Sequence, residues 1–348
     1  MAHKRKRRDP PRPGDPDEAL AAFDELFEAG DMESALNVVE AMLRRHPDDA
    51  ALNHAAGLAY WGLARFQSAA RSVARAAELD PTLPDPHLDL ATLLIDHLDQ
   101  PEEALRLLKP ARRAMSTPAL QAALHALRGR AWLALEETRS AHKELRRARK
   151  LAPDDPELAT ELAEVLLESL DLPGARLALD EALRLTPEPA RAHWLKAVLL
   201  DREGEHDAAV GEFEAAARID PEEFFVPERL GEEEFDGQME KALAGIPRRF
   251  RGHLENAEIA VDPYPSDSFL RDHGVSPLLL GLFLGTPLTL WTFEHADLPP
   301  RILVFQRNLE NLCRTRRELV REIGITLRHE IGHLLGMEED DLADAGHA

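Results

Sequence analysis

Proline recurs through the first two-thirds of the chain at a nearly constant interval. The six prolines are Pro47, Pro81, Pro118, Pro153, Pro187 and Pro221, so their positions advance by 34, 37, 35, 34 and 34. Each follows an Ala-rich amphipathic segment such as RSVARAAELDP, which predicts a helix that ends near the proline. A period of about 34 residues is typical of a solenoid of helical pairs. The sequence therefore predicts six repeats over 16–221.

Small side chains recur where the two helices of one repeat must approach each other. Alanine lies twelve residues before the closing proline at Ala69, Ala141, Ala175 and Ala209. It lies five residues before the proline at Ala76, Ala148, Ala182 and Ala216. On two of the first helices, Gly57 precedes Tyr60 and Gly129 precedes Trp132. Ala and Gly let antiparallel helices touch, while the bulky residue fills the groove between them.

The combination of Gly57, Tyr60, Ala69, Ala76 and Pro81, which recurs in similar form two repeats later, resembles the tetratricopeptide repeat (TPR) family. The resemblance covers about 200 residues and implies an all-α TPR superhelix whose concave groove holds a peptide or protein partner. The side chains expected to face that groove are His54, Trp61, Arg130, Glu164, Arg191 and Trp194. Packing of the two tryptophans between neighbouring repeats is the alternative. The first repeat keeps the second-helix alanine but lacks the small residue on its first helix, as a terminal cap does.

Composition excludes several functional classes. The chain of 348 residues can hold two domains, and its net charge of −22 predicts repulsion from nucleic acid and anionic membranes. Residues 1–15 are basic and proline-rich, which predicts a disordered tail. The single cysteine, Cys313, excludes an internal disulfide and fits a reducing compartment, so we expect a cytoplasmic protein.

The pattern changes after Pro221. The acidic stretch EEFFVPERLGEEEFDG breaks the period and predicts a linker over 222–234, with a second domain over 235–348. A short helix is expected in FDGQMEKALAGIP, and strands are expected in AEIAVDPYP, in LLLGLFLGTPLTLWTFE and in PPRILVFQRNL. A long helix is expected from residue 314 to 335, from the apolar spacing of Leu319, Val320, Ile323, Leu327, Ile331 and Leu334. This is an α+β arrangement.

The last predicted helix carries the sequence HEIGH. His329 and His333 are four residues apart, so both imidazoles project from one helix face about a turn apart and can reach one Zn²⁺. Glu330 lies beside the metal position, where it can accept a proton from the attacking water. The alternative is an exposed helix end whose His and Glu side chains are solvated and bind no metal.

A catalytic zinc ion needs a third protein ligand and leaves its fourth position to water. Only fifteen residues follow His333, so the third ligand must come directly after the helix. Gly336 permits the backbone to reverse there, with a positive φ. The candidate carboxylates are Glu338, Glu339, Asp340 and Asp341, of which Glu339 is favoured.

The region from Phe235 to Leu342 resembles the small bacterial zincin-like metallopeptidases. The resemblance includes MEKALAGIPRRFRGHLENAEIAVDPYP, LLGLFLGTPL, LPPRILVFQRNLE and LRHEIGHLLGMEEDDL. The family motif ends H-E-x-x-H-x-x-G-x-x-D, and Glu339 here stands at the position of the final Asp. By analogy with zincins, substrate lies along an edge strand, expected from 287–294 or 301–307. Tyr264 and His295 are the polar candidates for stabilising the oxyanion.

Two functions follow from these observations. The first is a zinc metallopeptidase in which Glu330 is the catalytic base, with metal ligands His329, His333 and Glu339, and whose repeats recruit a protein substrate or regulator. The alternative is a TPR interaction scaffold with a catalytically inactive metal-binding zincin domain. The presence of all residues that the chemistry requires favours the enzyme.

Overall fold

The computed structural model describes residues 14–186, 189–247, 254, 257–285 and 300–337. Over these residues the chain forms sixteen helices and three short strands, and every strand lies after residue 257. An all-α region is therefore followed by a small α+β region, as the sequence predicts. The chain divides into two compact units, residues 1–165 and 166–348. None of the helices in the described part combines the length and apolarity that a bilayer crossing requires.

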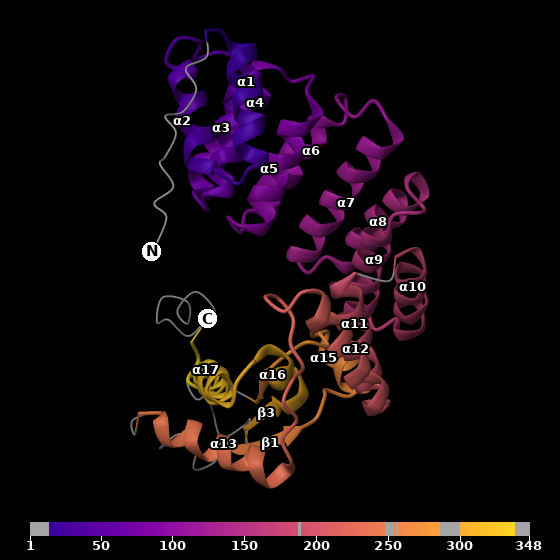
Figure 1. Cartoon of the computed structure of the whole chain (residues 1–348). Helices are drawn as coiled ribbons and strands as arrows, with labels where there is room; N and C mark the ends of the chain where they lie inside the picture. The colour runs from indigo at the N-terminus through magenta and orange to yellow at the C-terminus, as the bar shows by residue number, and fades with distance from the viewer. Residues whose placement is uncertain (1–13, 187–188, 248–253, 255–256, 286–299, 338–348) are drawn as a thin grey trace, which may run out of the picture. The chain divides into compact units, whose positions relative to one another are not determined.

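The first compact unit is a succession of helical pairs in which consecutive helices pack together (Figure 1). Its helices are α1 (Pro16–Glu28), α2 (Met32–Leu43), α3 (Ala50–Gly62), α4 (Phe66–Leu79), α5 (Pro84–Asp96), α6 (Pro101–Ala111), α7 (Pro118–Ala134) and α8 (Thr138–Leu151). Helix α9 (Pro156–Glu168) crosses the boundary between the units. Several helices begin at a side-chain cap: Asp15, Asp31 and Asp49 each accept a hydrogen bond from the backbone N–H three residues on.

The small residues expected at helix contacts are buried. All eight alanines at the two repeated positions are at most 1% exposed. Gly57 on α3 faces α4 so closely that an added Cβ would lie 2.4 Å from Cγ2 of Val73 and 3.3 Å from the carbonyl oxygen of Ala69. These contacts confirm that Ala and Gly permit the close approach of the two helices in a repeat.

A second period appears in the backbone. One residue in the turn within each repeat has a positive φ, and the six are Gly30, Ala64, Asp99, Glu136, Leu170 and Gly204. Their positions advance by 34, 35, 37, 34 and 34, nearly as those of the prolines do. Each turn reverses the chain between the two helices of a repeat, as the left-handed conformation at a helix end permits. Only two of the six are glycine, so glycine alone does not mark these turns.

The second compact unit joins the last repeats to the α+β region. Its further helices are α10 (Leu172–Leu185), α11 (Ala190–Arg202), α12 (His206–Ile219), α13 (Glu232–Gly245), α15 (Asp267–His273), α16 (Gln306–Leu312) and α17 (Arg316–Leu334). The strands are β1 (Glu258–Asp262), β2 (Gly281–Leu284) and β3 (Arg301–Phe305). They form a sheet of order β1-β3-β2, in which β1 is parallel and β2 antiparallel to β3.

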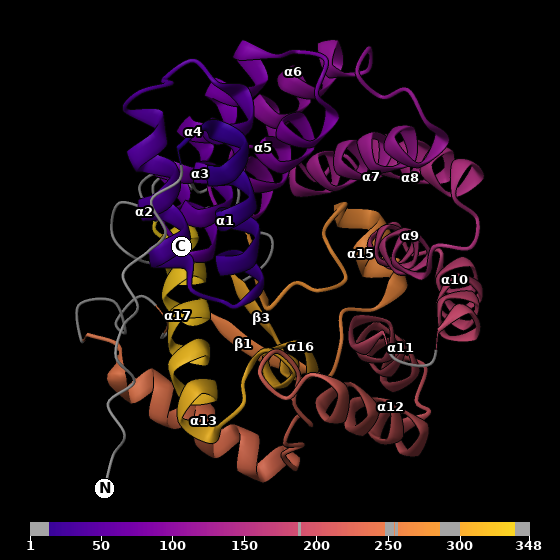
Figure 2. The same ribbon diagram turned by 45° about the horizontal axis from the view of Figure 1, so that its top comes forward.

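The core of the α+β region lies between α17, α13 and the sheet (Figure 2). Leu319, Ile323, Leu327 and Ile331 form the apolar stripe of α17 and pack with Ile302 and Val304 of β3 and with Phe235 and Met239 of α13. Leu334 is also buried, whereas Val320 is half-buried. The long final helix and its core-facing residues thus follow the predicted spacing.

Candidate metal centre and its surroundings

Helix α17 is capped at both ends, which fixes where its histidines lie. At the start, Thr315 Oγ1 accepts a hydrogen bond from the N–H of Glu318. At the end, the N–H of Met337 bonds to the carbonyl of Gly332, and Gly336 has a φ of 80°. This left-handed glycine reverses the chain one turn after His333, so the predicted reversal at Gly336 is confirmed.

The two histidines of the motif converge in the structure. Nε2 of His329 and Nε2 of His333 lie 3.0 Å apart, and their rings meet edge to face with centroids 4.7 Å apart. Zinc–nitrogen bonds of about 2.0–2.1 Å at a tetrahedral angle separate two ligand nitrogens by about 3.3 Å. The observed pair is therefore close to the spacing that one metal ion requires.

The side chain of Glu330 extends from α17 to the sheet. It is buried, and Oε2 accepts a hydrogen bond of 2.6 Å from the backbone N–H of Phe283 in β2. The carbonyl of Leu280 accepts from the N–H of Phe305, and bonded positions alternate along an antiparallel pair. Leu282 therefore directs its backbone toward β3, while Phe283 directs its N–H to the opposite edge. Of the strands that the structure describes, β2 thus supplies an edge that contacts the motif helix.

Gly281 explains why β2 lies so close to α17. A Cβ at this position would come within 2.6 Å of Cγ2 of Thr326, 3.1 Å of the Leu303 carbonyl and 3.4 Å of Cγ of Glu330. Only glycine lets the strand backbone approach the helix to this distance. Neither Gly281 nor Phe283 belongs to a sequence motif, although a glycine inside an apolar run is a signal of close backbone approach.

Other predicted site residues either lie outside the described residues or have a different place in the fold. The candidate ligands Glu338 to Asp341, the segment 287–294 and His295 lie outside the described residues. Within the described residues, no group of three or more His, Cys, Asp or Glu side chains is arranged to hold a metal ion. The expectation that 301–307 supplies the substrate edge is wrong, because β3 is the central strand and pairs on both sides.

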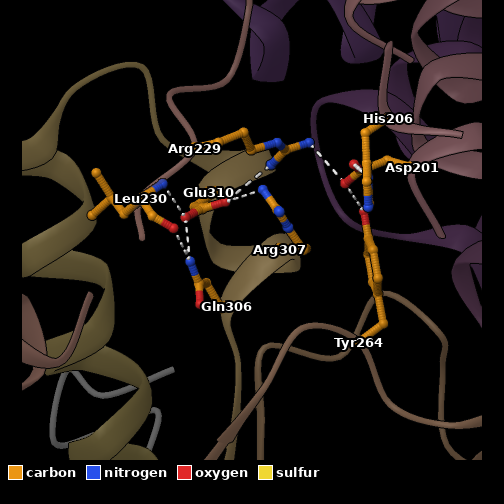
Figure 3. Close-up of polar contacts among 8 residues, drawn as sticks. All are labelled: Asp201, His206, Arg229, Leu230, Tyr264, Gln306, Arg307 and Glu310. Carbon is orange, nitrogen blue, oxygen red and sulfur yellow. Dashed lines mark hydrogen bonds and ion pairs between the residues drawn. The ribbon is translucent and has the colours of Figure 1, made fainter. Parts of the chain in front are cut away.

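Helix α16, which leads into α17, is fixed by a buried carboxylate (Figure 3). The Glu310 side chain is fully buried and accepts hydrogen bonds from the backbone N–H of Leu230 (3.0 Å) and from Nε2 of Gln306 (2.7 Å). Its other oxygen contacts Arg229 and Arg307, each at 3.2 Å. Four groups therefore compensate the desolvation of one carboxylate, as a buried charge requires.

Arg229 continues this network into the last repeat. It contacts Asp201 at the end of α11 at 3.0 Å, and Asp201 also accepts hydrogen bonds from the Tyr264 hydroxyl (2.6 Å) and from Nδ1 of His206 (2.8 Å). Burial acts to raise the pKa of Asp201. The hydrogen bond from Tyr264 and the charge of Arg229 outweigh this effect, so the pKa lies below its usual value.

Tyr264 therefore has a different role from the one expected. Its hydroxyl donates to Asp201, and burial together with this neighbouring carboxylate raises the pKa of the phenol. The structure thus corrects the expectation that Tyr264 stabilises an oxyanion: the residue joins the loop after β1 to α11. The sequence carries no motif that links residues 201, 229, 264 and 310.

Three of the six residues expected in the repeat groove contact a neighbouring first helix or its C-cap. Nε2 of His54 lies 2.6 Å from Asp89, and Arg130 pairs with Asp96 and approaches Glu161 to 3.8 Å. Trp61 donates a hydrogen bond to His97. These contacts place part of the set on one face of the helices in the first unit.

Trp194 in the second unit is a packing residue. Its ring contacts Phe213 of α12 at a centroid distance of 4.8 Å, and it also contacts Phe224 and Phe225. These contacts lie within its own repeat and with the segment that follows it, so the alternative of packing between neighbouring repeats is not borne out for Trp194. Glu164 and Arg191 are half-buried.

Comparisons with known families agree with this architecture. Residues 20–84, 127–187 and 160–224 match the tetratricopeptide repeat family, and residues 254–347 match the zincin-like metallopeptidase family. The chain consists of a TPR region followed by a zincin-like metallopeptidase domain. The zincin-like domain therefore indicates a metallopeptidase-related function, and the TPR region indicates protein interaction.

Two solved TPR structures resemble the repeat region. PilF of Pseudomonas aeruginosa is 18% identical with a TM-score of 0.51, and covers 64% of this chain and 96% of its own. PilW, a type IV pilus biogenesis factor, is 17% identical with a TM-score of 0.53, and covers 59% of this chain and 94% of its own. At these identities the likeness shows the fold alone. No curated protein matches the chain.

Proposed function

We propose that this chain is a cytoplasmic zinc-dependent metallopeptidase whose TPR region binds a protein substrate or regulator. One observation carries the proposal: the Nε2 atoms of His329 and His333 converge at 3.0 Å on the helix that also holds the buried Glu330 against β2. The donor types and their spacing fit zinc, because two imidazoles and a trailing carboxylate are a common catalytic set.

The metal would be held by His329, His333 and a carboxylate after Gly336, of which Glu339 is favoured. When bound, zinc supplies a Lewis acid that polarises the scissile carbonyl and makes water a stronger nucleophile near neutral pH. Glu330 accepts the proton of the attacking water at its carboxylate and passes it to the leaving amine. The backbone N–H of Phe283 binds that carboxylate and fixes its orientation, so the side chain of the base is held in place.

The edge of β2 is the proposed place for the substrate backbone. On this edge the N–H of Phe283 is already bonded to Glu330, and by the same alternation the backbone groups of Gly281 lie on the same edge, where they are the groups offered to a substrate. An extended peptide can add to such an edge through main-chain hydrogen bonds. Its scissile bond would then lie near Glu330.

The test replaces Glu330 with Gln and measures zinc content and hydrolysis of a broad peptide library by the full chain. Gln keeps an oxygen that accepts the Phe283 N–H, so we expect zinc to be retained and hydrolysis to be lost. A matched control is Glu322→Gln, a half-buried carboxylate two turns earlier on the same helix, which should keep both.

A separate variant tests the metal position. His333→Ala removes one converging imidazole and should lower zinc occupancy measured by elemental analysis. Retained zinc in this variant would contradict the ligand assignment. If the wild-type chain binds zinc stoichiometrically but cleaves no library peptide, the TPR scaffold with an inactive zincin domain replaces the peptidase.

A further inference from the structure

Positive charge is concentrated in one part of an acidic chain. Residues 101–151, which form α6, α7 and α8, contain 12 Lys and Arg against 5 Asp and Glu, a net charge of +7. Because the whole chain carries −22, the remaining residues carry −29. Such an asymmetry marks this region as an electrostatic feature separate from the rest of the surface.

The structure gathers these cations around two adjoining hollows. The first, about 630 Å³, is lined by Lys109, Pro110, Arg112 and Arg113 at the end of α6. The second, about 440 Å³, is lined by Arg112, Gln121, His125, Arg128, Arg147, Lys150 and Leu151. Arg112 belongs to both, so the two hollows form one surface. Every charged or titratable side chain that lines them is basic.

One buried carboxylate lies beneath this cationic surface, which we define as Lys109, Arg112, Arg113, Arg128, Arg147 and Lys150. Glu144 contacts Nδ1 of His125 at 2.6 Å, Arg147 at 2.8 Å and Arg128 at 3.7 Å. These contacts hold the two arginines in place, but a single carboxylate balances only one of six fixed charges. The surplus is therefore available to an anion from solution.

The cationic surface lies on a different face from the repeat groove. At about 100° per residue, the helical positions of Gln121, His125 and Arg128 fall within about 60° of one another on α7. Arg130 lies about 180° from Gln121 on the same helix. Because Arg130 contacts Asp96 and Glu161 on the first helices of the adjacent repeats, the side that carries the hollows is opposite to it.

We propose that the cationic surface on α6, α7 and α8 is a docking site for an acidic segment of a partner protein. Two hollows that share Arg112 suit an extended chain bearing several carboxylates rather than one isolated anion. Arginine side chains bind carboxylates through paired N–H groups. The site is independent of the metal centre, and it gives the chain a second means of selecting a protein.

An acidic peptide fits better than a nucleic acid. A nucleic acid carries charge at every phosphate along its length, and it would extend beyond this surface onto a chain that otherwise carries −29. A peptide of about eight extended residues spans at most about 29 Å. Such a peptide can confine its carboxylates to the two hollows.

The experiment measures binding of a fluorescently labelled octaglutamate peptide to the full chain by anisotropy. We expect binding at about 50 mM salt that weakens strongly at about 300 mM, as screening of exposed charges requires. Arg112→Glu should weaken binding by about tenfold or more, because this arginine is shared by both hollows and reversal adds repulsion. Lys150→Glu should weaken it in the same direction.

The matched control is Arg71→Glu on α4, an exposed arginine whose side chain bonds to Ser68 of its own helix. It makes the same charge change outside the cationic surface and should leave affinity unchanged. Equal losses in Arg71→Glu and Arg112→Glu would overturn the proposal, as would absence of peptide binding. Stronger competition by a single-stranded oligonucleotide of equal charge would assign the surface to nucleic acid instead. Circular dichroism verifies that each variant is folded.

Discussion

The helix contacts within a repeat and the junction between α11 and α16 at Asp201 are stabilised in different ways. Within a repeat, Gly57, Ala69 and Ala76 bring two helices together without any charged group. At the junction, Arg229 bridges two buried carboxylates, Asp201 and Glu310, and ties α11 to α16. The first contact depends on the absence of side-chain volume, whereas the second depends on complete compensation of charge.

This difference determines how each region responds to substitution. A close apolar contact loses stability when atoms are added. A buried ionic network loses most when one partner is removed, because the remaining charges stay buried without compensation. The following variants test that contrast.

Arg229→Ala should have the largest effect. It leaves Asp201 and Glu310 buried without their common partner, and we expect a loss of about 3–5 kcal/mol in the stability of the second unit. Cys313 is buried in the core of that unit, and burial together with nearby carboxylates raises the pKa of its thiol to about 12. Its reaction with a thiol reagent across a urea titration therefore reports local unfolding.

The control for Arg229 is Arg316→Ala. Arg316 also contacts two carboxylates, Glu228 and Glu234, but all three side chains are about half exposed. Water replaces such contacts readily, so the midpoint of Cys313 exposure should hardly move. Equal shifts in the two variants would show that the buried ion pairs of the junction contribute no more to stability than the exposed pairs of Arg316.

Gly57→Ala should have an intermediate effect. The new Cβ meets Val73 and the backbone of α4, and overpacking of this kind costs about 1–3 kcal/mol. Gly211→Ala on α12 provides the contrast, since nothing lies within 4 Å of its added Cβ, and it should gain about 1 kcal/mol from helix propensity. Urea titration followed by circular dichroism measures both. A stabilising Gly57→Ala would contradict close packing at this contact.

Ala64→Gly should have the smallest effect. Ala64 has a φ of 55° in the turn between α3 and α4, where a Cβ is unfavourable, and its side chain is exposed, so glycine removes little packing. Relief of that strain exceeds the added chain entropy of glycine, so we expect a gain of about 0.5–1 kcal/mol. Thermal melting detects it. Gly204→Ala, at the equivalent turn with a φ of 83°, should lower the stability by a similar amount. If both substitutions changed the stability in the same direction, backbone strain at these turns would be refuted.

The repeats could be predicted because their determinants are local and periodic. Ala141, Ala148 and Gly129 recur at intervals set by helix geometry, so each repeat supports the interpretation of the next. The left-handed turns at Ala64 and Glu136 escaped prediction because no residue type there requires a positive φ. Their regularity comes from the reversal between packed helices rather than from local sequence preference.

The candidate site was partly predictable for the same reason. The spacing of His329, Glu330 and His333 on one helix fixes their relative positions, and Gly336 marks the reversal. Strand order is not encoded locally, so the central position of β3 was missed. The same holds for the contact from Phe283 to Glu330, which arises only when a separate strand packs on the helix.

The division of the chain within α9 has a consequence for how this architecture is inherited. A recombination or truncation ahead of Arg229 in the acidic stretch 222–234 would separate Asp201 and His206 from Arg229, Tyr264 and Glu310, and would leave buried charges without partners on both fragments. We therefore expect the final repeats and the HEIGH-bearing region to be inherited as a single unit.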